Sequence, residues 1–221
     1  VPKRLFHHPS PDGDASAGGA SNINPYLFDA PNVLIWNRSR PICDVPAMGI
    51  GSQPIDGGNF IYKDDERDEI LKREPGAAKI MHPFLGSQEF INGKSRTVLW
   101  LGEATDEELL DLPLCRGRVD AVREFRLTSN RAQTRKAADR PAHFGTEIIS
   151  KSTAIIVPKV SSERREYVPM GFVGPETFCS DLVFLVPEAS IYHYGILQSQ
   201  FHNAWMRTVC GRLESRYRYS A

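Results

Sequence analysis

Residues 152–187 read STAIIVPKVSSERREYVPMGFVGPETFCSDLVFLVP, and this stretch decides the fold class. Its apolar runs at 154–157 and 182–186 are short and are separated by proline and glycine, which is typical of buried β-strands. The segments on both sides show helical signals instead. Because strands and helices occur in blocks and do not alternate strictly, we expect an α+β fold with a mixed or antiparallel sheet and several packed helices.

The chain before this stretch carries two helical signals. A helix is predicted over residues 64–72, started by its aspartates and ended by Pro75. A capping box at Thr105 and Glu108 predicts a second helical region, which we expect to run to about residue 138 with a break at a proline.

Three further segments complete the outline. Residues 1–22 are rich in Pro, Gly, Ala, Ser and Asp and predict a linker or irregular segment, so the ordered domain is expected over 23–221. The apolar residues 33–36 (VLIW) suit a buried strand. A helix over about 191–210 is followed by the basic tail SRYRYSA. Since the sequence starts with Val1 and not with Met, we expect a fragment or a processed chain.

The net charge is zero, with 27 Lys and Arg against 27 Asp and Glu, but the charges are unevenly distributed. Residues 1–113 carry 11 basic and 17 acidic side chains, a balance of −6, whereas residues 114–166 carry 12 and 6, a balance of +6. A neutral total therefore contains an acidic first half and a basic middle. A local patch of one sign matters more to a polyanionic partner than the sum does.

Missing motifs exclude several kinds of site. The chain has no Gly-x-x-x-x-Gly-Lys-Ser/Thr phosphate loop, no Gly-x-Ser-x-Gly elbow and no His-Glu-x-x-His pair. The (Asn/Asp)-Pro-Pro-(Tyr/Phe) loop of amino-methyltransferases and the Glu-x-Lys of common metal-dependent nucleases are missing too. We therefore expect no catalytic centre, no metal site and no cofactor in this chain. A small enzyme using Asp181, His193 and a nearby serine is an alternative that the spacing does not support.

The cysteine spacing and the hydropathy of the chain bear on its cellular compartment. The four cysteines are far apart and form no Cys-x-x-Cys pair. No apolar run approaches the roughly 20 residues that a membrane span needs. These features favour reduced thiols in a cytoplasmic protein without a membrane partner.

The basic middle predicts a basic helix over about residues 114–140. Four of its arginines, spaced 7, 8 and 4 residues apart, would share one face of a continuous helix: Arg116, Arg123, Arg131 and Arg135. Such a stripe suits contacts with DNA phosphates, which supply affinity and not sequence choice. The alternative is a solvated face balanced by acidic neighbours.

The hexapeptide SSERRE at 161–166 follows a predicted buried strand. In an extended segment, Glu163 and Arg165 would point to one side and Arg164 to the other. Arginine can donate a fork to guanine, and glutamate can accept from the amino group of cytosine. The alternative, which these residues alone favour, is a salt-bridged strand end at the surface.

Five long runs carry a resemblance to a known family. They are NINPYLFDAPNVLIWNRSRPICDVPAMGIGSQPIDGGNF (22–60), EPGAAKIMHPFLGSQEFING (74–93), RVDAVREFRLTSNRAQTRKAADRPAHFG (118–145), VSSERREYVPMGF (160–172) and HYGILQSQFHNAWMRTVCGRLESRYRYS (193–220). Together they resemble the region downstream of the methyltransferase domain in MmeI-like (type IIL) single-chain restriction–modification enzymes. The resemblance covers about residues 22–221.

The resemblance implies a role for this region. Such enzymes carry nuclease, adenine methyltransferase and target-recognition parts in one polypeptide, and the recognition part is an α+β unit resembling those of type I specificity subunits. By position match, Glu163 and Arg165 are expected to read bases, with Asn130 and Arg131 as further candidates. Phosphate contacts are expected from a basic set: Arg116, Arg123, Arg126, Arg135, Lys136, Arg140, Lys159 and Arg164.

The expected function is therefore sequence-specific recognition of double-stranded DNA for a bacterial enzyme. The resemblance implies a methyltransferase domain of the same polypeptide as partner, to which the target adenine is presented, and S-adenosylmethionine as the cofactor of that domain. It leaves open whether the parent enzyme also cleaves DNA. The rival interpretation is a protein–protein interaction scaffold whose basic helix docks against an acidic surface.

Overall fold

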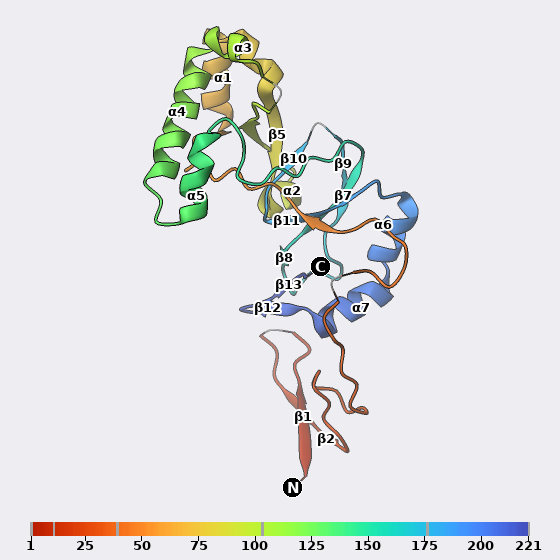
Figure 1. The fold of residues 1–221 in the computed structure, drawn as a ribbon. Helices are drawn as coiled ribbons and strands as arrows, with labels where there is room; N and C mark the ends of the chain where they lie inside the picture. Colours follow the sequence, from red (N-terminus) through yellow and green to blue (C-terminus); the bar gives the residue numbers. More distant parts are fainter. Residues whose placement is uncertain (1, 11, 39, 103, 176, 221) are drawn as a thin grey trace.

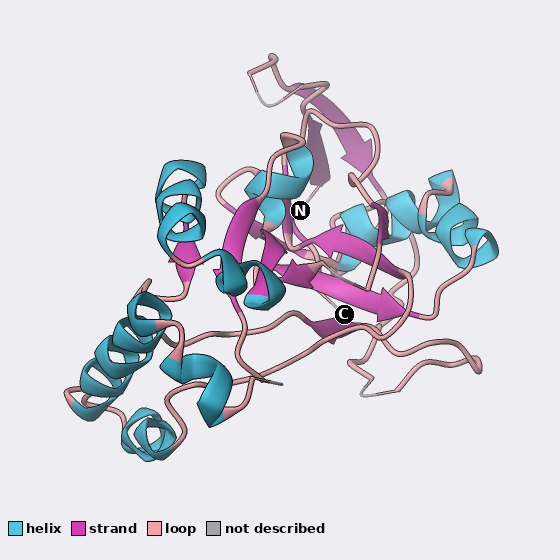
Figure 2. Ribbon diagram, turned by 90° about the horizontal axis from the view of Figure 1, so that it is seen from above, coloured by secondary structure: helices cyan, strands magenta, loops and turns pink. Residues whose placement is uncertain are grey.

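The computed structural model describes residues 2–10, 12–38, 40–102, 104–175 and 177–220. Its sheets are antiparallel or mixed and its helices pack beside them, so the predicted α+β class is confirmed. Figure 1 shows a helical lobe with one sheet, a second sheet in the middle, and a third, small sheet from which an N-terminal hairpin extends away. Seen from above, the strands occupy the centre and helices lie on both sides (Figure 2). Among the described residues, no helix is both long enough and apolar enough to cross a bilayer.

The helical lobe is built on a four-stranded sheet in the order β10-β5-β6-β4. Its strands are β4 (Ile61–Tyr62), β5 (Met81–Leu85), β6 (Arg96–Leu99) and β10 (Phe178–Cys179). The same part of the chain contributes α1 (Asp64–Arg73), the 3-10 helix η1 (Pro75–Ile80), α2 (Ser87–Ile91), α3 (Asp106–Leu110), α4 (Pro113–Leu127), α5 (Ala132–Lys136) and the 3-10 helix η2 (Ala137–Asp139). β10 joins this sheet from the distant β-rich segment and runs parallel to β5.

The longest helix, α4, forms because its buried positions recur at helical spacing. Pro113 lies in the first turn, where a missing backbone N–H removes no helical hydrogen bond. Cys115, Val119 and Val122 are buried in the lobe core, and their spacing of four and three residues places them on one face. Arg126 continues this buried face one turn further on.

The basic segment is not one helix, so the predicted basic helix over 114–140 is wrong. Between α4 and α5, Thr128 donates its hydroxyl to the carbonyl of Phe125 at 3.0 Å, and the hydroxyl of Ser129 accepts from the amide of Arg131 at 3.2 Å. Such local side-chain bonds compete with continuation of a helix. The four arginines predicted to share a face therefore lie on two helices and the link between them.

The N-terminus of α4 is capped by a buried glutamate that lies 40 residues away in the sequence. The Glu74 carboxylate accepts from the amides of Leu114 at 2.5 Å and Cys115 at 3.2 Å, two of the free N–H groups at the beginning of the helix. The expected capping box at Thr105 and Glu108 involves the Glu108 side chain, which lies outside the described residues.

The middle sheet has the order β3-β11-β7-β9. It consists of β3 (Gly49–Ile50), β7 (Ala154–Pro158), β9 (Gly171–Val173) and β11 (Val183–Pro187). Alternate side chains of β7 and β11 enter two different cores: Ile155, Val157, Phe184 and Val186 enter one, and Ala154, Ile156, Val183 and Leu185 enter the other. The continuous apolar runs in the sequence arise because both faces of this sheet are covered.

The C-terminal part carries the third sheet, in the order β12-β13-β8. Its elements are β8 (Val160–Ser161), α6 (Ile191–Leu197), α7 (Gln200–Val209), β12 (Gly211–Leu213) and β13 (Arg216–Arg218). The single helix expected over 191–210 is divided because the Ser199 hydroxyl donates to the Ile196 carbonyl at 2.7 Å and accepts from the His202 amide at 3.1 Å.

Two expectations for the N-terminal part are wrong. Residues 1–22 are not an irregular linker, because β1 (Lys3–His7) and β2 (Ser16–Ala20) pair as an antiparallel hairpin. Residues 33–36 form no strand and are exposed, with Trp36 77% exposed. An apolar run is buried only where a partner surface runs beside it, and the described residues supply none along this segment.

Candidate nucleic-acid interface

The SSERRE segment is a turn and not an extended strand. β8 ends at Ser161, where its pairing with β13 ends. The Ser162 hydroxyl then accepts from the Arg164 amide at 3.2 Å, and the Ser162 carbonyl accepts from the Arg165 amide at 3.2 Å. The expected alternation of side chains across an extended segment is therefore wrong. We call residues 162–166 the reading turn.

The two predicted base readers lie together on the reading turn in different environments. The side chain of Glu163 is only 15% exposed, and its nearest cation is Arg164 Nε at 3.9 Å. No described residue donates a hydrogen bond to its carboxylate. Arg165 is exposed, and its guanidinium has no partner among the described residues. Arg164 also points into solvent and pairs with Asp12 of the N-terminal hairpin at 2.7 Å.

Glu163 lines a pocket of about 490 Å³ between the N-terminal hairpin and the third sheet. The other lining residues are His7, His8, Pro9, Ser10, Arg207, Arg212, Ser215 and Tyr217. The ring of Tyr217 is contacted by the guanidinium groups of Arg207, at 5.7 Å, and Arg212, at 4.2 Å. The pocket is therefore basic and aromatic around one carboxylate. Lys159, predicted to bind phosphate, directly precedes β8 of the third sheet, and its Nζ lies 4.9 Å from the centre of the Phe184 ring.

The remaining predicted contact residues other than Arg126 lie in the helical lobe, away from the reading turn (Figure 1). All of them are exposed: Arg116 and Arg123 on α4, Asn130 and Arg131 in the link, Arg135 and Lys136 on α5, and Arg140 after η2. Arg135 Nη1 donates to the Ser129 carbonyl at 2.9 Å, which orders the link beside Asn130. The structure thus divides the predicted residues into a helical-lobe group and a reading-turn group.

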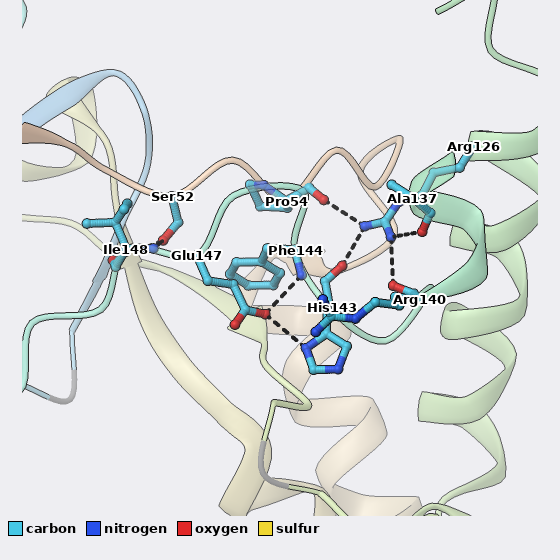
Figure 3. A network of polar contacts seen from close by, with 9 residues as sticks. All are labelled: Ser52, Pro54, Arg126, Ala137, Arg140, His143, Phe144, Glu147 and Ile148. Carbon is cyan, nitrogen blue, oxygen red and sulfur yellow. Dashed lines mark hydrogen bonds and ion pairs between the residues drawn. The ribbon is translucent and has the colours of Figure 1, made fainter. Parts of the chain in front are cut away.

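Arg126 does not belong to either group. Its side chain is completely buried, and all five N–H donors of the guanidinium are bound by backbone carbonyls. Figure 3 draws the bonds to Pro54, Ala137, Arg140 and His143. Nε donates to Ile55 at 2.9 Å. Nη1 donates to Ala137 at 2.9 Å and Arg140 at 3.0 Å. Nη2 donates to Pro54 at 2.9 Å and His143 at 2.6 Å. The prediction that Arg126 binds phosphate is wrong, because no donor is left for an external anion.

The Arg126 contacts continue into a seam that joins the lobe to the middle sheet (Figure 3). The Ser52 hydroxyl donates to the Ile148 carbonyl at 3.0 Å and accepts from the Ile148 amide at 2.9 Å. Glu147 accepts from the Phe144 amide at 3.1 Å. Burial lowers the pKa of Arg126, an effect opposed by the negative charge of Asp56. This seam ties the end of α4 to the segment that follows β3 and to the segment that precedes β7.

Sequence reasoning missed the residues that surround Glu163. Arg207, Arg212 and Tyr217 come from the C-terminal region, and His7 and His8 from the segment expected to be a linker. The basic, tyrosine-bearing tail was a signal for part of this set, but the sequence offers no spacing that links it to residue 163. The alternative triad is not assembled among the described residues: His193 contacts the Ser190 hydroxyl at 3.0 Å, but Asp181 accepts from Gln53 and makes no contact with His193.

Comparisons with known proteins identify the family. The sequence matches the family described as MmeI, target recognition domain, over residues 29–221. DNA methyltransferase A of Bacillus subtilis (strain 168) is 40% identical over 201 residues, which cover 91% of this chain and 23% of that protein. A solved structure of the type IIL restriction-modification enzyme MmeI in complex with DNA superposes with a TM-score of 0.93 at 40% identity, covering 100% of this chain and 29% of that one. The chain thus spans about a quarter of the length of its curated relative. It belongs to the MmeI target recognition domain family.

Proposed function

We propose that this chain reads a double-stranded DNA sequence through its reading turn. The observation that carries the proposal is the Glu163 carboxylate, which is 15% exposed and has no hydrogen-bond donor among the described residues. A carboxylate withdrawn from water without donors is costly, and an amino group on a base edge supplies the missing donor. Two residues away, the free guanidinium of Arg165 offers the fork that guanine accepts.

The helical-lobe group is proposed to hold the DNA backbone. Arg116, Arg123, Arg135, Lys136 and Arg140 are exposed cations, and an exposed cation near a phosphate releases condensed counterions. Such contacts fix the register of a protein on the duplex without reading its sequence. The other two members of the helical-lobe group, Asn130 and Arg131, lie in the ordered link between α4 and α5 and are proposed as secondary base readers.

The relatives support this assignment. MmeI was solved in complex with DNA, and this chain superposes on part of that enzyme along its whole length. We propose that the parent protein is a bacterial adenine-specific DNA methyltransferase of the restriction–modification type. Its methyltransferase domain, in the same polypeptide, would use S-adenosylmethionine and receive the target adenine from this domain.

The test is selection of sequences from a random duplex library by the wild-type chain and two variants. Glu163→Gln keeps the shape of the side chain and removes its charge, and Glu166→Gln makes the same change at an exposed position of the same turn. We expect Glu163→Gln to change the preferred base pair at one position, with a loss of about 1–3 kcal/mol of discrimination. Glu166→Gln should keep the wild-type preference. Identical behaviour of the two variants, or no enrichment by the wild type, would refute the proposal.

A further inference from the structure

Helix α7 presents polar side chains to the backbone at the end of the reading turn and directly after it. Arg207 Nη2 donates to two successive carbonyls, Arg165 at 2.9 Å and Glu166 at 2.6 Å. One helical turn earlier, the buried Asn203 accepts from the Val168 amide at 3.1 Å. Because residues four apart lie on one face of a helix, Asn203 and Arg207 act on the same strip of backbone.

The Val168 carbonyl is held as well, since it accepts from Gln198 Nε2 at 2.8 Å. The backbone of residues 165–168 is therefore bound to the α6–α7 unit at three of its four residues. On the side toward Glu163, the turn is closed by the hydrogen bonds of Ser162. Among the described residues of the α6–α7 unit, Arg207 is the one that binds Arg165 and Glu166, so its contacts are the anchor of this unit nearest to the proposed base readers.

The geometry of Arg207 suits this role better than direct recognition. Its Nη2 already serves two carbonyls, and its guanidinium rests against the Tyr217 ring. The bonds to charged donors are the stronger kind, so they hold the two carbonyls in place. Base reading requires side chains held within about 0.5 Å of the productive geometry, which a free surface turn does not provide.

We propose that Arg207 is a positioning residue for sequence reading: it fixes the backbone that carries Glu163 and Arg165 and contacts no base itself. This inference rests on the proposed function. The rival role is phosphate binding, because Nε and Nη1 of Arg207 make no protein hydrogen bond among the described residues and could donate to a phosphate. The two roles predict different measurements, because phosphate contacts control salt dependence and positioning controls discrimination.

The test compares Arg207→Met and Arg207→Lys with the control Arg218→Met. The control removes an exposed charge from β13, the strand that pairs with β8 before the reading turn. Amide hydrogen exchange is measured without DNA at Arg165 and Val168, whose amides donate to Ser162 and Asn203. Random-duplex selection and the salt dependence of binding are measured with DNA. In Arg207→Met we expect exchange of these amides to rise about tenfold or more. Discrimination should fall about 5- to 150-fold at the base pair that Glu163→Gln also affects, with an unchanged salt slope.

Arg207→Lys should keep much of the discrimination, because an ammonium group can still donate to both carbonyls. Arg218→Met should change neither exchange nor discrimination. Unchanged exchange in Arg207→Met would overturn the proposal, and so would a salt slope shallower by about 0.9 with discrimination intact, the signature of a lost phosphate contact. A wild-type chain that enriches no sequence would refute the proposed function as well. The two failures are distinguishable because the exchange measurement contains no DNA.

Discussion

Replacement of Arg126 by methionine tests the conclusion that this arginine holds the fold together and does not bind DNA. Methionine keeps a long apolar stem but removes all five donors, so five carbonyls each lose one hydrogen bond. The carbonyls of Pro54, Ala137 and Arg140 keep a backbone N–H donor, whereas those of Ile55 and His143 keep none among the described residues. Hydrogen bonds to a charged group contribute about 1.5–3 kcal/mol each, but the five share one side chain and are not additive. Because the surface loops can open and admit water to the carbonyls, we expect a loss of about 3–5 kcal/mol, the range for breaking a buried charged network.

Urea unfolding of the variant gives the magnitude. With a slope of about 2–3 kcal/mol per molar, the midpoint should fall by roughly 1–2.5 M. Arg126→Lys has three donors for five carbonyls and should lose about half as much. The control is Arg123→Met, an exposed arginine three residues earlier on α4, for which the change should stay within about 0.5 kcal/mol.

Two results would refute this reasoning. The first is a loss of less than about 1 kcal/mol in Arg126→Met, no larger than that of the exposed control. The second is an unchanged stability together with a weaker salt dependence of DNA binding, which would return Arg126 to the phosphate-binding set.

Two further predictions concern buried titratable groups. Burial raises the pKa of the Cys115 and Cys179 thiols to about 12, so at pH 8 an alkylating reagent should modify the exposed Cys43 and leave these two intact until the protein unfolds; their modification in the folded chain would contradict the core packing. Burial lowers the pKa of His202 below its ordinary value of 6.5, so the unfolded chain binds more protons and acid favours unfolding. The free energy of unfolding should therefore decline from about pH 7 to pH 5, and His202→Gln should flatten that decline. An equally steep decline in His202→Gln would contradict this assignment.

The parts of the fold that the sequence predicted are those in which one local signal was sufficient. The apolar runs of β7 and β11 predicted strands because both of their faces are covered. The stop at Pro75 predicted the end of α1. The wrong predictions concern segments whose structure depends on contacts with other side chains or with a covering surface. Residues 33–36 lack a covering surface, and the helix breaks at Thr128 and Ser199 depend on single hydroxyl groups that also fit inside helices.

The candidate site was predicted in part for similar reasons. The family resemblance led to Glu163 and Arg165, which the structure places two residues apart on one turn. Composition alone suggested Arg126 as a surface cation, because charge in a sequence carries no information on burial. The buried role becomes visible only when the carbonyls of residues 54–55 and 137–143 are brought to the same guanidinium. Arg207 could not be assigned from sequence because its contacts are with backbone atoms some 40 residues away.

The measurement that tests the central claim most directly is the ratio of two dissociation constants of the wild-type chain, measured at the same salt concentration. One is for the duplex enriched by selection, and the other is for a duplex of equal length and composition with a scrambled sequence. A domain that reads DNA sequence should prefer the selected duplex by about 10³-fold, the lower end of specific recognition. A ratio close to one, with binding that depends only on salt, would contradict sequence reading and leave a nonspecific phosphate-binding surface.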